Sequence, residues 1–326
     1  MKNFINFIVD ENDNNKRIDL VITEKFNKLS RSKVKSSILS GNLKINSKMI
    51  IDPAKKIKTL DNIFFQSKEE EKFILEPYNY ELNIVYEDED LIVINKDAGM
   101  SIHPGAGNYD KTLVNALINI NKRKLSSIGD KYRPGIVHRI DKNTSGLIVI
   151  AKNDRTHSNL SEQFKNHSVD RIYISLVWGK LRPQNGRIEN LIRRSNKNRK
   201  LMEIGLTKGK KAITNYKTLK LFENKNIPTF SLLECKLETG RTHQIRVQLS
   251  NLGNHILGDD KYKKKFKKIK NIDESLNNDL NNLKRQFLHA KTLGFIHPIK
   301  GSKLNFNSEL PVELDKILKK LSKYSK

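Results

Sequence analysis

The sequence predicts an α+β protein of two domains. The chain has 326 residues, which exceeds the usual size of about 100 to 200 residues for one domain. Stretches typical of strands and of helices follow one another without a regular βαβ alternation, which favours α+β over α/β. A charged segment at 67–80 contains Pro77 and is typical of a linker. We therefore expect a small α+β domain with its linker in residues 1–75 and a larger domain in residues 76–326.

The small domain is expected to contain two helices followed by short strands. A helical stretch near 18–22 precedes Ser30, a suitable N-cap for a helix that ends before Gly41. Strands are then expected at 43–45 and 50–51. Arg31 and Lys35 share one strip of the second helix, where they could meet phosphates. Taken alone, a solvated helix face is the better explanation of this pair.

Short apolar runs indicate the strands of the large domain. The expected strands span 82–86, 91–96, 146–152, 171–178 and 230–237. The third is apolar on both faces, which is typical of a central strand. In the fourth, the alternation directs Tyr173 away from the main apolar face, which argues against core packing of this side chain.

Two helices of the large domain are expected from their apolar spacing. The first covers 155–168. The second follows a turn at Gly240, and Thr242 is expected to cap it. Arg246 lies at the edge of its apolar stripe. That stripe consists of Ile245, Leu249 and Leu252.

The charge of the chain favours a nucleic-acid partner. Lys and Arg total 62 against 36 Asp and Glu, which gives a net charge of +26 and attracts polyanions. A genome rich in A and T could enrich lysine without any function. The clustering of the charge speaks against that explanation, because residues 261–270 alone contain seven Lys and are expected to form a basic loop that contacts phosphate or water.

Other features of the composition predict a cytoplasmic protein. A single cysteine, Cys235, permits neither a disulfide framework nor a thiolate metal site. No apolar stretch approaches the roughly 18 residues of a membrane span, and the apolar run in residues 1–9 is too short for the core of a signal peptide.

A polar loop in residues 133–152 contains the first candidate for catalysis. Polar groups directly before a central strand commonly belong to a functional site. Asp141 stands there among His138, Arg139 and Lys142, and such cations can hold a carboxylate ionised, as a nucleophile requires. An aspartate that caps a turn explains the same spacing at least as well.

A second candidate segment spans 237–262. It is expected to form a strand, a tight turn and a helix that carries Arg246. An arginine at the edge of an apolar stripe needs an anionic partner if it is buried. A phosphate-binding loop would look the same. No glycine-rich phosphate loop of the kinase type and no His-Glu-x-x-His pair occurs in the sequence, which disfavours kinase and zinc-hydrolase chemistry.

Six blocks of the large domain occur in an order known from one family. They are VYEDEDLIVINKDAGMSIHPGAGN from Val85, TLVNAL from Thr112, GIVHRIDKNTSGLIVIAK from Gly135, RIYISLVWG from Arg171, LETGRTHQIRVQ from Leu237 and QFLHAKTLGFIHP from Gln286. Together they resemble the pseudouridine synthases of large-subunit ribosomal RNA, most closely the D-type enzymes of 23S rRNA. The resemblance implies a mixed, largely antiparallel central sheet with flanking helices and an active-site cleft.

The small domain resembles an S4-type RNA-binding module. The similarity lies in RIDLVI from Arg17 and in LSRSKVKSSILSGNLKIN from Leu29. Both resemblances point to RNA as the partner.

The resemblance also assigns roles to single residues. It implies that Asp141 is the catalytic aspartate, that Tyr173 is the active-site tyrosine and that Arg246 pairs with the aspartate. Substrate or RNA contacts are expected from Arg139, Thr144, Arg241, His243 and Gln244, and in the small domain from Arg31, Lys33 and Lys35. The sequence departs from the family pattern at Asp97, Asn143 and Lys263, which concerns the fit of the substrate more than the chemistry.

The implied reaction breaks the N-glycosidic bond of uridine, turns the base and rejoins it through carbon. Atoms and electrons balance, so neither a metal nor another cofactor is expected. A guanidinium should hold the carboxylate of Asp141 ionised, in bidentate geometry. The flipped uridine should stack on Tyr173, whose hydroxyl could accept a proton late in the reaction. The sequence does not distinguish covalent attack by Asp141 from removal of a sugar proton.

The function expected from the sequence is isomerisation of specific uridines in 23S rRNA or its precursor. The enzyme is expected to be a cytoplasmic monomer that does not contact a membrane. One alternative is the same chemistry on tRNA or on other rRNA sites. The other is a non-catalytic ribosome-assembly factor with an S4 domain, and the complete set of Asp141, Tyr173 and Arg246 speaks against it.

Overall fold

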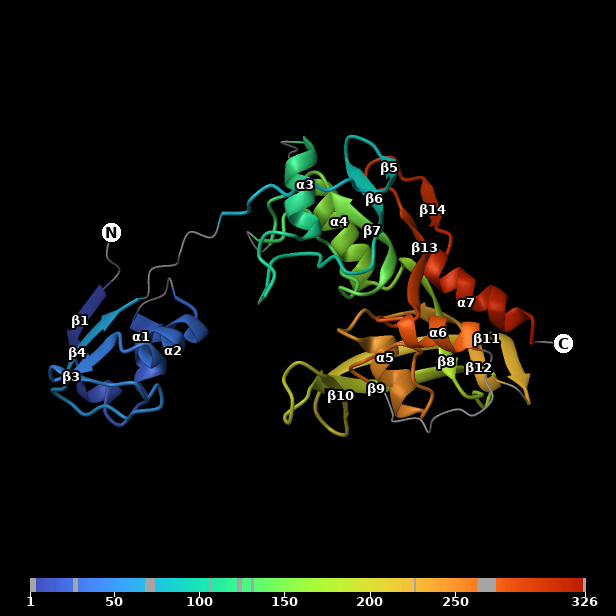
Figure 1. Ribbon diagram of the computed structural model, residues 1–326. Coiled ribbons are helices and arrows are strands. Elements are labelled where there is room, and N and C mark those ends of the chain that lie inside the picture. The colour runs from blue at the N-terminus through green and yellow to red at the C-terminus, as the bar shows by residue number, and fades with distance from the viewer. Residues whose placement is uncertain are drawn as a thin grey trace. The chain divides into compact units, whose positions relative to one another are not determined.

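Two compact units, Met1–Ile74 and Leu75–Lys326, make up the chain (Figure 1). The computed structural model describes residues 4–25, 29–67, 74–105, 107–121, 125–129, 132–225, 227–262 and 274–324. Most of the basic segment expected at 261–270 lies outside the described residues. The division between the units lies one residue before the domain boundary expected from the sequence.

The first unit combines a four-stranded antiparallel sheet with two helices. The strands lie in the order β1 (Phe4–Ile8), β4 (Asn62–Gln66), β2 (Leu43–Ile45) and β3 (Lys48–Met49). The helices are α1 (Ile18–Lys25) and α2 (Arg31–Leu39), and a 3-10 turn, η1, covers Glu11–Asp13. Apolar side chains from the helices and the strands share one core, which includes Val21, Val34, Ile38, Ile63 and Phe65.

Two details of this unit differ from the expectation. The strand expected at 50–51 lies at Lys48–Met49, and the strand β1 was not expected at all. Ser30 does occupy the N-cap position of α2, but its side chain makes no capping hydrogen bond.

The second unit is built on a ten-stranded, largely antiparallel sheet (Figure 1). In chain order its strands are β5 (Ile84–Glu87), β6 (Leu91–Lys96), β7 (Ser145–Ala151), β8 (Asp170–Trp178), β9 (Asn185–Arg194), β10 (Met202–Gly205), β11 (Lys210–Asn224), β12 (Ile227–Leu237), β13 (Leu288–Ile296) and β14 (Lys303–Asn307). Their order in the sheet is β10-β9-β11-β12-β8-β13-β7-β6-β5, with β14 paired to β13. This mixed sheet and its helices confirm the predicted α+β class.

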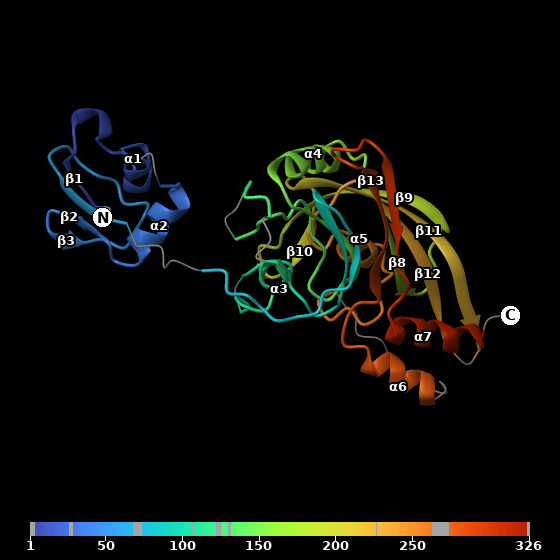
Figure 2. The same cartoon turned by 90° about the horizontal axis from the view of Figure 1, so that it is seen from above.

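Among the described residues, five helices accompany this sheet. They are α3 (Leu113–Asn121), α4 (Asp154–Lys165), α5 (Gln244–Asn251), α6 (Glu274–Asn282) and α7 (Val312–Ser322). Figures 1 and 2 show α6 and α7 side by side, and α4 lies along β7. No helix in the described part of the chain has both the length and the apolar character needed to cross a membrane.

Strands β6 and β7 are covered on both faces. Ile94 and Ile148 belong to the largest apolar cluster of the unit, whereas Val93 and Val149 belong to a second cluster that includes Leu160 of α4. Each such side chain contributes about 1.5 to 3 kcal/mol when it is fully buried. The prediction that the run before Lys152 is a central strand is therefore confirmed.

Gly146 permits the one parallel pairing found between the described strands, that of β7 with β13. Its φ is +114°, and a Cβ at this position would lie 2.2 Å from the carbonyl oxygen of Ala290. Only glycine combines this backbone conformation with so close an approach. This parallel pairing with β13 fixes the start of β7, which directly follows the loop that carries Asp141.

Candidate active site

Asp141 lies in the loop before β7 and directs its carboxylate at Arg246. The backbone closes a turn here, because the amide of Thr144 donates to the carbonyl oxygen of Asp141 at 3.0 Å. The carboxylate takes no part in that turn. Its Oδ2 accepts a hydrogen bond from Nη1 of Arg246 at 2.8 Å. Within the described residues its Oδ1 accepts none, so side-chain capping does not explain Asp141.

Arg246 lies on the buried side of α5 between two carboxylates. Its Nε and Nη2 donate to the two oxygens of Asp259 at 2.7 and 2.8 Å. The expectation of a bidentate pair with Asp141 is therefore wrong, because the planar fork is occupied by Asp259 and Asp141 receives a single bond. Burial alone would lower the pKa of Arg246, but the hydrogen bond to Asp259 and the charges of both carboxylates raise it above its usual value.

Asp259 was not predicted as a site residue. It is fully covered, with a side chain 1% exposed, and its Oδ1 also accepts the backbone amides of Lys261 and Tyr262. The sequence offered one signal, since Asp259 lies in the candidate segment at 237–262. Its partner lies 13 residues earlier, and only the fold brings the two together.

The first turn of α5 differs from the expectation. The N-cap is His243 and not Thr242, with a left-handed φ of 56° and no side-chain capping bond. Gln244 stabilises the turn instead. Its Oε1 accepts from the hydroxyl of Thr239 and the amide of Arg241, and its Nε2 donates to the carbonyl of Ile213 and the hydroxyl of Thr214. Gln244, expected to contact RNA, uses its whole amide within the protein.

His243 presents an imidazole edge to Asp141. The hydroxyl of Tyr262 accepts the amide of Met202 at 2.8 Å and lies 2.7 Å from Nδ1 of His243. While its oxygen accepts that amide, the hydroxyl can still donate its proton to Nδ1, and this arrangement places the ring proton of His243 on Nε2. This Nε2 lies 3.9 Å from Oδ2 of Asp141. Burial lowers the pKa of His243 to about 4, so the ring is neutral at physiological pH.

Tyr173 is buried, contrary to the expectation that it points away from the core. Its side chain is 7% exposed and belongs to the largest apolar cluster. The prediction failed because β8 lies in the middle of the sheet with both faces covered, where alternation no longer distinguishes a solvent face. Tyr173 nevertheless lines the same cavity as Asp141. Burial raises its pKa to about 12, so it is a neutral phenol at physiological pH.

One cavity brings together all eight site residues expected in the large domain. They are Arg139, Asp141, Thr144, Tyr173, Arg241, His243, Gln244 and Arg246. The cavity measures about 50 Å³, room for a few waters, so side chains must move before a nucleobase can enter. It adjoins a second cavity of about 550 Å³, with which it shares Arg139, Arg171, Gly240 and Arg241.

The expected cations of the small unit gather around one acid. Asp19, which is buried, accepts hydrogen bonds from Arg17 and Arg31 at 3.0 to 3.1 Å and lies 3.6 Å from Nζ of Lys35. Three cations against one carboxylate leave a positive excess on this face. Lys33 lies on an exposed side of α2.

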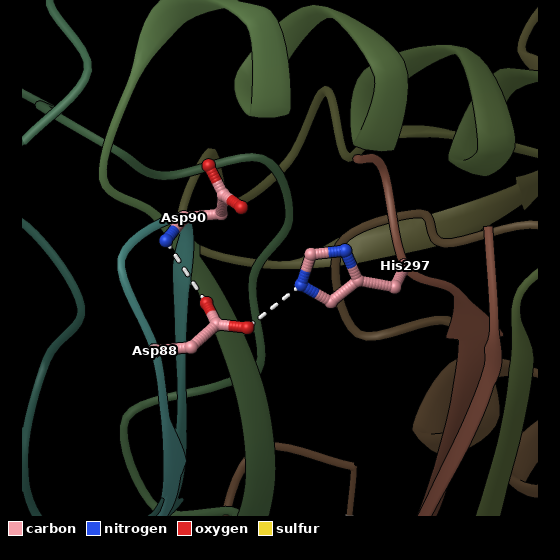
Figure 3. A group of neighbouring side chains, drawn as sticks. All are labelled: Asp88, Asp90 and His297. Atoms are coloured by element: carbon pink, nitrogen blue, oxygen red, sulfur yellow. Dashed lines mark hydrogen bonds and ion pairs between the residues drawn. The ribbon is translucent and has the colours of Figure 1, made fainter. Parts of the chain in front are cut away.

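A cluster of Asp88, Asp90 and His297 has the composition of a metal site (Figure 3). Nδ1 of His297 accepts the amides of Ile299 and Lys300, so Nε2 carries the proton and donates to Asp88 at 2.8 Å. No ring lone pair is left for a cation, and Nζ of Lys300 contacts the same oxygen of Asp88. The cluster links the turn between β5 and β6 to the turn after β13.

Comparisons with known proteins agree on one family. The sequence profile described as RNA pseudouridylate synthase matches residues 90–251. The chain is 43% identical to ribosomal large subunit pseudouridine synthase D of Zymomonas mobilis, over 94% of this chain and 93% of that one. It is 36% identical to an uncharacterised RNA pseudouridine synthase of Bacillus subtilis, over 98% of this chain and 99% of the other.

A solved structure supports the fold. Human RNA pseudouridylate synthase domain containing 4 matches with a TM-score of 0.55 and 24% identity, covering 74% of this chain and 93% of the human one. The sheet, the cavity around Asp141 and similarity over nearly the whole sequence lead to one conclusion: the chain belongs to the RNA pseudouridine synthase family and is an isomerase.

Proposed function

We propose that this enzyme isomerises specific uridines of 23S rRNA, with Asp141 as its catalytic carboxylate. One observation carries the catalytic assignment. Oδ2 of Asp141 accepts a hydrogen bond from Arg246, Oδ1 accepts none within the described residues, and Asp141 lines the cavity. A carboxylate that attacks the sugar or removes its proton needs one oxygen fixed and the other open.

The neighbouring residues divide the remaining tasks. Arg246 keeps Asp141 ionised, since an adjacent guanidinium favours the charged carboxylate. Tyr173 supports the flipped base from the covered side of the cavity. Because burial raises the pKa of Tyr173 to about 12, its hydroxyl stays protonated at neutral pH and offers no phenolate to accept a proton. We therefore assign Tyr173 to stacking and not to proton acceptance.

Replacement of the catalytic carboxylate tests this assignment. We expect Asp141→Ala to abolish pseudouridine formation in a transcribed rRNA fragment while RNA affinity stays within a few-fold of wild type. Asp110→Ala is the matched control, because Asp110 is an exposed acid of the same unit, and it should leave the rate unchanged. Unchanged activity in Asp141→Ala would end the catalytic assignment.

The choice of 23S rRNA rests on the relatives. The Zymomonas mobilis relative is named a ribosomal large subunit synthase, whereas the Bacillus subtilis relative is named only an RNA pseudouridine synthase. The second name supports a second candidate, the same chemistry on tRNA or on other rRNA sites. Mapping of pseudouridines in a deletion strain separates the two. Loss at a tRNA position with the large-subunit sites intact would overturn the 23S assignment.

The first unit is proposed as an S4-like RNA-binding domain. Its support is the sequence resemblance from Arg17 and Leu29 together with the cations around Asp19. Contacts of this kind position RNA without reading bases. The monomeric state and the cytoplasmic location stay predictions.

A further inference from the structure

The larger cavity beside the active site is lined by cations without any carboxylate. It measures about 550 Å³. Its charged residues are Arg133, Arg139, Lys165, Arg171 and Arg241, and no Asp or Glu belongs to its lining. His138 also lines the cavity but adds no positive charge, because burial lowers the pKa of its ring to about 3. The cavity therefore has the electrostatics of an anion site.

Arg171 is the buried cation of this cavity. It is 6% exposed, and its Nη2 donates to the carbonyl oxygen of Glu238 at 2.9 Å. Its Nε is buried without a hydrogen-bond partner. Within the described ranges no salt bridge joins Arg171 to a carboxylate, and burial lowers its pKa. A desolvated guanidinium with one neutral acceptor is costly unless an anion completes its contacts.

The protein holds this guanidinium in a defined place. The ring of Phe164 lies 5.3 Å from the Cζ of Arg171. On another side the backbone of Gly240 comes so close that a Cβ at this position would lie 2.7 Å from Nη1. A side chain at position 240 would therefore push Nη1 of Arg171 aside. Within the described residues, Arg171 is thus a fixed, buried cation that has no carboxylate partner and is positioned to bind an anion.

Arg171 also connects the two cavities. It lines both of them, together with Arg139, Gly240 and Arg241. On β8 it stands two residues before Tyr173, and side chains two residues apart in a strand project from the same face. An anion held by Arg171 would therefore lie next to a base held at Tyr173.

We propose that this cavity binds a backbone phosphate of the RNA, within one or two nucleotides of the target uridine, with Arg171 as its buried anchor. The inference rests on the proposed function. A phosphodiester presents two non-bridging oxygens, which suit the planar donor fork of arginine. Arg241 and Arg139 at the junction of the cavities complete the positive surroundings. Capture of this phosphate fixes the register of the RNA, so that one particular uridine reaches Asp141.

The test removes the charge of one RNA phosphate and, in a second variant, also the charge of Arg171. An RNA stem-loop that the wild-type enzyme modifies is synthesised with a single methylphosphonate at each position within three nucleotides of the target. Affinity is measured with Asp141→Ala and with Asp141→Ala carrying Arg171→Gln, both unable to react. At one position the methylphosphonate should weaken binding about tenfold or more with Arg171 present. With Arg171→Gln it should weaken binding less than twofold.

Controls separate this site from general charge effects and from misfolding. Arg155→Gln removes an exposed arginine of α4 outside the cavity and should keep the full tenfold effect. If Arg171→Gln does not fold, judged by circular dichroism, Gly240→Ala serves instead, because it displaces Nη1, and it should likewise abolish the sensitivity. Equal methylphosphonate effects with and without Arg171 at every position would overturn the proposal. Failure of the wild-type enzyme to form pseudouridine in any stem-loop of 23S rRNA would instead refute the proposed function.

Discussion

At the scale of single residues, Arg246 determines the state of the site. Its Nε and Nη2 donate hydrogen bonds to the carboxylate of Asp259, and its Nη1 donates one to Asp141. A bidentate pair with Asp141 would occupy both oxygens of the carboxylate. Division of the guanidinium between two acids orients Asp141 and leaves Oδ1 for the substrate. Asp259 therefore acts through Arg246 as a positioning residue.

Removal of the charge on Asp259 should displace Arg246 towards Asp141. We expect Asp259→Asn to lower the single-turnover rate about 100-fold, as small displacements of catalytic groups do. It should also destabilise the protein by about 1 to 3 kcal/mol, since a buried cation loses a charged partner. Denaturant unfolding and rapid-quench kinetics measure the two effects. The neighbouring Asp260, which is exposed, provides the control Asp260→Asn, and equal rates in both variants would contradict this role.

His243 should keep one neutral tautomer across the physiological range. With a pKa lowered to about 4 by burial, the ring should carry its proton on Nε2 from pH 5 to 8. Long-range 1H–15N spectra of protein labelled at histidine report the tautomer directly, and His243→Asn identifies the signal. Tyr262→Phe removes the hydroxyl that faces Nδ1, so the tautomers should then mix. A charged ring at pH 6 in the wild type would refute the assignment.

At the scale of elements, one continuous apolar run was easier to place than the start of α5. The strand expected at 91–96 has those bounds in the structure, because a continuous apolar run between polar residues has few alternatives. The start of α5 was wrong, since the side chain of Gln244 stabilises this turn by contacts with Ile213 and Thr214 of β11. No local pattern reveals such contacts. The burial of Tyr173 was missed for the same reason, as alternation does not say what covers each face.

The three residues proposed for catalysis were nonetheless identifiable from the order of the blocks. The sequence did not show which side chains form ion pairs with one another. The roles proposed for Asp259 and Arg171 could be recognised only from the fold, which brings distant segments together. The two ion pairs of Arg246, for example, join it to residues that lie 13 and 105 positions away along the chain.

Substitution of Gly146 tests the parallel pairing between β7 and β13. Gly146→Ala should destabilise the protein by at least about 3 kcal/mol, because a Cβ would overlap the carbonyl of Ala290 and the strained φ adds about 1 to 2 kcal/mol. Gly253→Ala separates the two causes. Its φ of +84° is also left-handed, but nothing lies within 4 Å of a Cβ there. Urea midpoints should show the smaller loss for Gly253→Ala, and equal losses would show that the contact with Ala290 is unimportant.

At the scale of the whole molecule, the residues proposed for catalysis lie in the second unit and the cations gathered around Asp19 lie in the first. Each unit has its own apolar core, and all residues of the Asp141 cavity belong to the second unit. The described lining of this cavity therefore comes from the second unit. The cations of the first unit, gathered around Asp19, are suited to phosphate contacts that raise affinity.

Removal of the first unit should therefore affect binding more than catalysis. We expect a chain of residues 75–326 to need a higher RNA concentration for half-maximal rate, while its single-turnover rate at saturating RNA stays within a few-fold of wild type. The dependence of affinity on salt should also become less steep, because fewer phosphates are neutralised. Single-turnover kinetics over a range of RNA and salt concentrations measure both quantities. A collapse of the rate at saturating RNA would show that the first unit helps to build the active site, since the isolated second unit retains Asp141, Arg246 and Asp259 with all their mutual contacts.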